Sequence, residues 1–335
     1  GGANLLSAVE ASARAAAGRL SSEALVADCL ARIRARDPHI GAWVCVDANR
    51  ALEQARTLDR QTPRGPLHGI PLGIKDVLDT CDLPTAYGSV IYQGNLPARD
   101  SVCVAALRRA GAVILGKTVT TEFASPWPIG VRNPHDLTRT PGVSSSGSAA
   151  SVADFMVPLA IGTQTGGSII RPATYCGIVG FKASLDGLDR GGIRHLRPSL
   201  DTLGLFARSL ADIALMRSAV TGATNTGIAR LKRAPRLGLC RTGDWPRARP
   251  ETQRAFALAE EKLRSAGAEC IAIELPETFA TAIETFAVIT AWEGAIALQR
   301  ELREHSDAMN PWLREFAAKL VTLSPENYEA AKRHA

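Results

Sequence analysis

The pattern of apolar and polar positions alternates between two periods along most of the chain. Some stretches repeat apolar residues every three or four positions, as amphipathic helices do, and others are short continuous apolar runs typical of buried strands. Strands that alternate with helices predict a layered α/β fold. The predicted helices are 5–17, 22–36, 50–60, 101–110, 146–155, 169–176, 210–220 and 251–266, and the predicted strands are 43–46, 70–74, 112–115, 158–162, 236–240 and 270–273.

The alternation continues to residue 273, and the rest of the chain is mostly helical. We therefore expect one domain over residues 1–335, with a core at 65–220 and a smaller helical lobe at 225–335. Residues 325–335 read as a helix without a glycine cap, a proline or a polar tail after it.

Lys75 is unusual because it closes an apolar run. It is one of only seven lysines, and no charge interrupts residues 69–74 before it. Burial disfavours the charged form and lowers the pKa of a lysine, and a neutral amine can accept a proton. The alternative is a lysine at a strand end that reaches water or pairs with Asp76.

Two clusters of serine and glycine lie on either side of an apolar segment within residues 141–182. Ser144 opens the first cluster, and Ser168 closes the second twenty-four positions later. Small residues let backbone N–H groups approach a ligand, so a hydroxyl among them suits a nucleophile beside an oxyanion hole. Serine clusters also occur in flexible linkers, but residues 152–161 between them are too apolar for that interpretation.

The two clusters, the sequence GIPLGIKD ending at Asp76, and GKTVTTEF at 116–123 together resemble the amidase signature family. The resemblance runs from about residue 21 to the end of the chain. It implies an α/β/α fold with a central mixed sheet and a Ser–cis-Ser–Lys triad. By motif position, Ser168 would be the nucleophile, Lys75 the base, and Ser144 the bridging serine after a cis peptide bond from Val143.

The resemblance also implies the remaining site. Backbone N–H groups of Thr165, Gly166, Gly167 and Ser168 would form the oxyanion hole. For the substrate we expect contacts from Ser145 and from Trp127 and Ile129 in the loop 125–133, although the two loop residues could equally be packing.

Four positions depart from the family pattern. Gln164 stands where an acid is usual, and Ile170 stands where an arginine is usual, with Arg171 after it. Val143 replaces a common glycine, and Ala183 replaces a common proline. None of these changes removes a member of the triad, but they alter its surroundings. The family also continues well beyond a segment such as residues 328–335, so the chain looks truncated at its C-terminus.

The function expected from the resemblance is hydrolysis of a carboxamide to an acid and ammonia or an amine, with no cofactor and no metal. One alternative is the glutaminase subunit of a transamidating complex, and another is a catalytically silent, truncated homologue. The partner we expect is a small-molecule amide, and an exposed apolar helical lobe would permit a homodimer.

Composition excludes some other classes. The net charge of +6 comes from arginines spread along the chain, and aromatic residues are 5 %, so nucleic-acid binding is not expected. The seven cysteines show no C-x-x-C pairing and the six histidines no metal-ligand spacing. We find no signal peptide and no apolar run near the ~18 residues of a membrane span, so we expect a cytoplasmic location and no membrane contact.

Two features would suggest another chemistry, a match to the P-loop pattern and a histidine near a site segment. Residues 111–118, GAVILGKT, match the P-loop pattern, but their central residues are the predicted strand and so cannot cradle phosphate. His68 is the only histidine near a site segment, and we interpret it as a loop residue rather than the base of a Ser–His pair.

Overall fold

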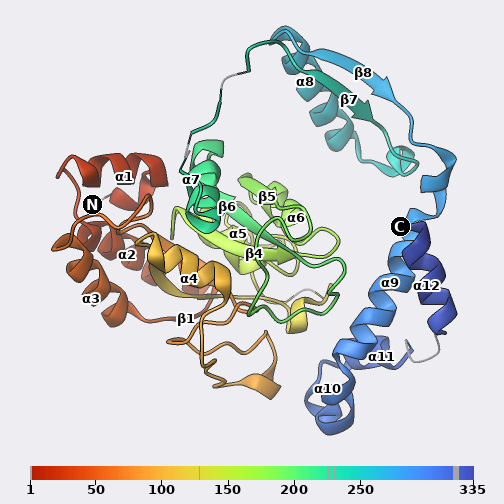
Figure 1. The fold of residues 1–335 in the computed structure, drawn as a ribbon, viewed down its shortest axis with the longest axis horizontal. Helices are drawn as coiled ribbons and strands as arrows, with labels where there is room; N and C mark the ends of the chain where they lie inside the picture. Colours follow the sequence, from red (N-terminus) through yellow and green to blue (C-terminus); the bar gives the residue numbers. More distant parts are fainter. Residues whose placement is uncertain (1, 128, 225–226, 230, 320–323) are drawn as a thin grey trace. The chain divides into compact units, whose positions relative to one another are not determined.

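The described chain forms two compact units. The computed structural model describes residues 2–127, 129–224, 227–229, 231–319 and 324–335 (Figure 1). The first unit comprises Gly1–Ile228 with Glu293–Thr322, and the second comprises Ala229–Trp292 with Leu323–Ala335. The first unit contains all the predicted site segments.

A six-stranded mixed sheet is the centre of the first unit. Its order is β1-β3-β2-β4-β6-β5, with β2 parallel to both β3 and β4, and antiparallel pairs at β1–β3, β4–β6 and β5–β6. This confirms the predicted α/β fold with a central mixed sheet. The strands are β1 (Trp43–Val46), β2 (Pro71–Lys75), β3 (Val113–Thr118), β4 (Leu159–Gln164), β5 (Val179–Lys182) and β6 (Thr202–Ala207).

The inner strands are continuous apolar runs because they are buried on both faces. Every residue of β2, β3, β4 and β6 is buried, and helices pack against the sheet, among them α5 on β4 and α7 on β6. The helices before residue 228 are α1 (Ala8–Ala16), α2 (Ser22–Ile40), α3 (Ala48–Asp59), α4 (Val102–Arg109), α5 (Ser146–Ala153), α6 (Ile170–Tyr175) and α7 (Leu210–Thr221). Short 3₁₀ turns occupy Ala3–Leu5, Val90–Tyr92 and Glu122–Ala124.

Two strands were missed in the sequence. β5 is short and half-buried, and β6 contains Gly204, which weakens a strand pattern. Glycine is favoured there because a Cβ would lie 2.8 Å from the Phe181 backbone oxygen and would also meet the Ile169 side chain. Helix α2 also continues through Pro38 to Ile40, beyond its predicted end.

The second unit contains a parallel pair of strands, β7 (Arg236–Cys240) and β8 (Glu269–Ile273), which confirms both predicted strands. Helix α8 (Pro250–Ser265) connects them, and Trp292 stacks on Tyr328 of α12 (Pro325–His334) with ring centroids 5.5 Å apart. Helix α9 (Ala282–Ala297) crosses the boundary between the units; α10 (Gln299–Glu304) and α11 (Pro311–Lys319) belong to the first. The remaining 3₁₀ turns are Trp245–Arg247, Glu277–Thr281 and Ser306–Ala308.

One helical stretch is longer and more apolar than the sequence analysis expected of any segment. Glu277–Ala297 is, among the described residues, long and apolar enough to cross a membrane by length and composition alone. Core helices of soluble proteins pass the same test, so this finding does not establish a membrane contact.

Candidate functional site

Lys75 is the last residue of β2, and its side chain is completely buried. Its Nζ lies 2.6 Å from the Ser144 Oγ and 2.8 Å from the Thr163 Oγ1. Burial lowers the pKa of Lys75 to about 7, although the charge of Asp201 opposes that shift. A large fraction of the amine is therefore neutral near pH 7 and able to accept a proton.

Asp76 does not pair with Lys75, contrary to the alternative that the sequence left open. Its carboxylate lies 3.5 Å from the Nζ of Lys117, a second buried lysine on β3. Lys117 also donates to the Leu78 carbonyl at 2.7 Å and to the Thr85 Oγ1 at 2.5 Å. It therefore holds the loop after β2. Because Lys117 lies inside a fully buried strand, the P-loop interpretation is excluded.

The segment that carries Ser144 approaches α6 closely. Gly142, two residues before it, has a φ of 111°, and a Cβ there would lie 2.8 Å from the Pro172 Cα. Only glycine therefore allows this segment to approach α6 so closely. The position of Ser144 brings its hydroxyl to Lys75, as the triad prediction requires.

The predicted cis peptide bond between Val143 and Ser144 is wrong for this structure. No cis peptide bond occurs in the described residues, so this bond is trans. A trans bond is the lower-energy form for a residue other than proline. The trans backbone already places the Ser144 Oγ within hydrogen-bond distance of Lys75.

Ser168 lies in the turn between β4 and α6, where it is half-buried. Its hydroxyl forms no hydrogen bond within the described part of the chain, so the structure joins Ser144 to Lys75 but does not hydrogen-bond Ser168 to Ser144. Within the same part of the chain, the N–H groups of Gly166, Gly167 and Ser168 have no acceptor. A half-buried, unbonded hydroxyl beside free N–H donors is an arrangement suited to acyl transfer.

Gln164 shapes this turn in place of the acid usual in the family. Its Oε1 accepts from the N–H groups of Ile169 at 2.8 Å and Ile170 at 3.0 Å. A neutral amide oxygen thus satisfies the first donors of α6. Because Gln164 is uncharged, it cannot form an ion pair with Arg171, which is exposed.

Sequence reasoning missed two polar residues at the site. Thr163 is the second hydrogen-bond partner of Lys75. Its position near the end of β4, one residue before Gln164, is the sequence feature that could have identified it. Asp201 accepts a hydrogen bond from the Thr165 hydroxyl. No motif spacing pointed to Asp201, because it precedes β6, which was itself missed.

The proposed substrate contacts differ in their surroundings. Ser145 is fully buried, and its hydroxyl donates to the Thr163 carbonyl at 3.0 Å, so it fixes the backbone and does not face a substrate. Trp127 and Ile129 are 45 % and 37 % exposed. Trp127 stacks on Trp312 with ring centroids 5.5 Å apart, so one ring face is already covered.

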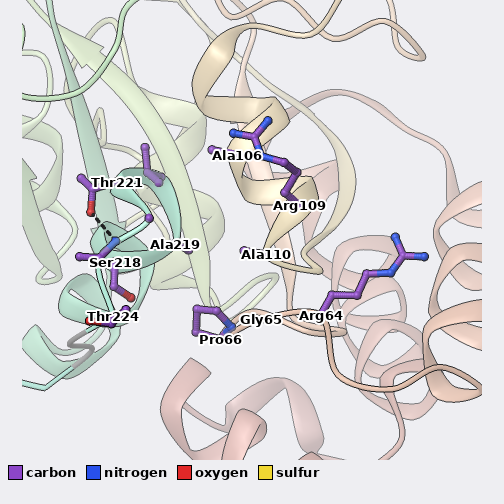
Figure 2. Close-up of a pocket in the computed structure, with 13 residues that line it drawn as sticks. Arg64, Gly65, Pro66, Ala106, Arg109, Ala110, Ser218, Ala219, Thr221 and Thr224 are labelled. Carbon is purple, nitrogen blue, oxygen red and sulfur yellow. Dashed lines mark hydrogen bonds between the residues drawn. The ribbon is translucent and has the colours of Figure 1, made fainter.

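An open pocket elsewhere in the first unit does not have this chemistry. It is lined by the α4 end, the α7 end and residues 64–66, and Figure 2 shows that Arg64 and Arg109 point away from each other. Its Ser218 hydroxyl donates to the Leu215 carbonyl at 2.7 Å. The pocket therefore has neither a nucleophile–base pair nor convergent charges.

Two other candidates have structural explanations. His68 contacts the Leu58 carbonyl at 3.0 Å and the Arg64 N–H at 3.2 Å, so it is a loop residue as expected. Cys81, Asp82 and Asp100 lie close enough together to hold a metal ion, but both carboxylates already pair with Arg108. We assign no metal to them.

The amidase family model matches residues 24–330 of this chain. The chain is 39 % identical over 332 residues to a glutamyl-tRNA(Gln) amidotransferase subunit of Acidothermus cellulolyticus, covering 92 % of this chain and 65 % of that protein. The corresponding protein of Streptomyces coelicolor is 37 % identical over 322 residues, with coverages of 88 % and 64 %. The chain thus spans slightly less than two thirds of the length of these relatives.

Solved structures share the fold. A structure titled as an amidase has a TM-score of 0.89 and 30 % identity, covering 98 % of this chain and 77 % of that chain. The native peptide amidase of Stenotrophomonas maltophilia has a TM-score of 0.84 and 31 % identity, with coverages of 98 % and 78 %.

Proposed function

Since the chain belongs to the amidase family, we propose that it hydrolyses a carboxamide to a carboxylic acid and ammonia or an amine. The observation that carries this proposal is the hydrogen bond between the fully buried Lys75 amine and the Ser144 hydroxyl. A buried amine without a carboxylate bonded to it costs stability, so its retention beside a hydroxyl suits a catalytic base better than a structural role.

The proposed reaction uses two serines and the lysine. Neutral Lys75 takes the Ser144 proton while Ser144 takes the Ser168 proton, and the Ser168 Oγ forms a bond to the amide carbonyl carbon. The N–H groups of Thr165, Gly166, Gly167 and Ser168 would supply the oxyanion hole, a contribution of about 3–4 kcal/mol per donor that the oxyanion reaches. The relay then returns its proton to the leaving nitrogen as the C–N bond breaks.

Deacylation runs through the same groups. Water gives a proton to the relay as its oxygen attacks the acyl carbon, and the ester bond to the Ser168 Oγ breaks. Ser168 recovers its proton, and the acid leaves. The oxygen of one water thus enters the product acid, and no external oxidant, reductant or cofactor is required.

The compartment is also a proposal. All seven cysteines are free thiols, and four of them are buried. Free, buried thiols suit a reducing compartment, so we propose a cytoplasmic location.

Amide hydrolysis tests the function. Wild type and Ser168→Ala would be given a panel of primary and secondary carboxamides, with product acid and released nitrogen measured separately. We expect equal amounts of both from wild type and no release above background from the variant. Equal turnover by Ser168→Ala would overturn the proposal.

The curated relatives favour a second candidate. Because they are named as amidotransferase subunits, this chain could supply ammonia to a partner protein. The discriminating observation is glutamine hydrolysis that requires addition of such partner subunits. Hydrolysis of simple amides by the isolated chain would favour the first candidate.

A further inference from the structure

A buried carboxylate links the nucleophile turn to the rest of the site. Asp201 is 8 % exposed and stands directly before β6. Its Oδ1 accepts from the Thr165 hydroxyl, while its Oδ2 accepts from the N–H groups of Leu196 and Arg197, each at 2.9 Å. The carboxylate therefore ties the residue-195 loop to the first residue of the turn that carries Ser168.

The same carboxylate borders the region of the base. A narrow recess is lined by both Asp201 and Thr163, the hydroxyl partner of Lys75. Ala124, Ile193, Arg194, His195 and Thr202 complete its lining. Asp201 thus lies between the elements that hold Ser168 and those that hold Lys75.

We propose that Asp201 is a positioning residue, which holds the Thr165–Ser168 turn through the Thr165 hydroxyl and places a negative charge toward Lys75. This inference rests on the proposed amide hydrolysis. Free N–H groups stabilise an oxyanion only when they are fixed in place, and a misplaced turn loses much of their effect. Asp201 is the only side chain among the described residues that hydrogen-bonds the Thr165 hydroxyl.

The charge of Asp201 is maintained by its neighbours. Burial would raise the pKa of its carboxyl, but the neighbouring His195, the Thr165 hydroxyl and the N–H and charge of Arg197 hold that pKa below its usual value. The His195 Nδ1 lies 3.7 Å from the Oδ2, which is beyond hydrogen-bond distance. Asp201 is therefore ionised wherever Lys75 titrates.

Three arginines lie near Asp201. Arg194 pairs with Glu301, and Arg190 donates to the backbone carbonyls of Pro198 and Asp201. Arg197 is buried and interacts with both Asp201 and Glu293. Asp201 is the charged group that acts on Lys75. The Asp76–Lys117 pair is also near, because Asp76 follows Lys75 directly and Lys117 lies on β3. Removing the Asp201 charge should favour the neutral form of Lys75.

The two roles can be separated by substitution. Thr165→Val removes the hydroxyl and keeps the Asp201 charge, so we expect kcat to fall by about 10- to 100-fold at every pH. The acid limb of the pH–rate profile, where the rate rises as Lys75 loses its proton, should not move. Thr165→Ser keeps the hydroxyl and should retain kcat within about threefold. Asp201→Asn removes the charge, so the acid limb of its pH profile should move to lower pH by about half a unit or more.

A matched control removes a carboxylate that has no contact with the site. Asp244 is exposed and pairs with Arg247, and Asp244→Asn should leave both kcat and the acid limb as in wild type. Thermal unfolding of each variant would show that it is folded. If Asp201→Asn does not fold, the Thr165 pair still tests the positioning of the turn.

The outcomes distinguish this inference from the proposed function. A wild type that hydrolyses no amide overturns both. An active wild type whose Thr165→Val variant keeps full kcat overturns the positioning role. An acid limb that Asp201→Asn leaves unmoved overturns the electrostatic role of the carboxylate.

Discussion

At the scale of single residues, Lys75 determines what the site can do. A lysine in water is almost wholly protonated at neutral pH and cannot accept a proton. Complete burial in β2 removes the solvation that favours its charged form. The two hydroxyls beside it, on Ser144 and Thr163, are partners that a neutral amine can use.

The pH dependence of acylation follows from that burial. Because the pKa of Lys75 is lowered to about 7, the neutral fraction rises with pH through that value and then levels off. We expect the acylation rate to increase about tenfold per unit well below pH 7 and to reach a plateau above about pH 8. Stopped-flow acylation by an activated amide or ester would measure this. A profile flat from pH 5 to 9 would contradict the role of Lys75.

At the scale of elements, the approach of the first serine segment to α6 is critical. Gly142 provides it with a left-handed backbone and no side chain, because a Cβ at this position would lie only 2.8 Å from the Pro172 Cα. The close approach of Gly142 to Pro172 thus fixes the backbone just before Ser144, whose hydroxyl reaches Lys75.

Gly142→Ala should therefore harm both stability and activity. We expect a loss of about 1–3 kcal/mol in the free energy of unfolding, together with a lower kcat, because the new methyl group meets backbone. Urea denaturation and amide hydrolysis measure the two effects. Gly243→Ala is the control, because nothing lies within 4 Å of a Cβ there and it should match wild type.

Some of the strands could be predicted from the sequence and others could not. Strands β1 and β7 were predicted with their observed ends, and β2 to within a residue, because apolar runs bounded by turns identify buried strands. β6 was missed because Gly204 interrupts its pattern for a packing reason that only the structure reveals, the nearby Ile169 side chain. Asp201 was missed with it.

The site was predictable where its residues form motifs. Lys75 and Ser144 come from separate segments, yet the structure places them 2.6 Å apart. The roles assigned to Ser168 and to the oxyanion donors remain predictions. Motifs did not predict the role of Gln164. The sequence shows that it departs from the family pattern, but only the structure shows its side-chain oxygen accepting from the N–H groups at the start of α6.

At the scale of the whole molecule, a buried ion pair joins distant parts of the first unit. The Glu301 carboxylate on α10 is fully buried and lies 2.5 Å from both the Arg194 Nη2 and the Tyr92 hydroxyl. The Arg194 guanidinium also lies over the Tyr87, Tyr92 and Phe123 rings. The segment after residue 293 is thereby fixed to the loop that follows β2.

Arg194→Leu should loosen that attachment. The change leaves the Glu301 carboxylate buried without its cation, so we expect a loss of about 3–5 kcal/mol in the free energy of unfolding. Amides of α10 should also exchange hydrogen faster than in wild type. Arg254→Ala breaks an exposed pair with Glu251 on α8 and serves as the control, with no measurable effect on either quantity. If the α10 amides of Arg194→Leu exchange no faster than those of wild type, Arg194 does not hold α10 in place.

The most direct test of the central claim is covalent labelling of the nucleophile. A fluorophosphonate probe, followed by intact-mass and peptide mass spectrometry, would be applied to wild type, Ser168→Ala, Lys75→Met and the control Ser218→Ala. We expect one adduct on Ser168 in wild type and in Ser218→Ala, none in Ser168→Ala, and strongly slowed labelling in Lys75→Met. A folded wild type that stays unlabelled, or an adduct on another residue, would contradict the claim.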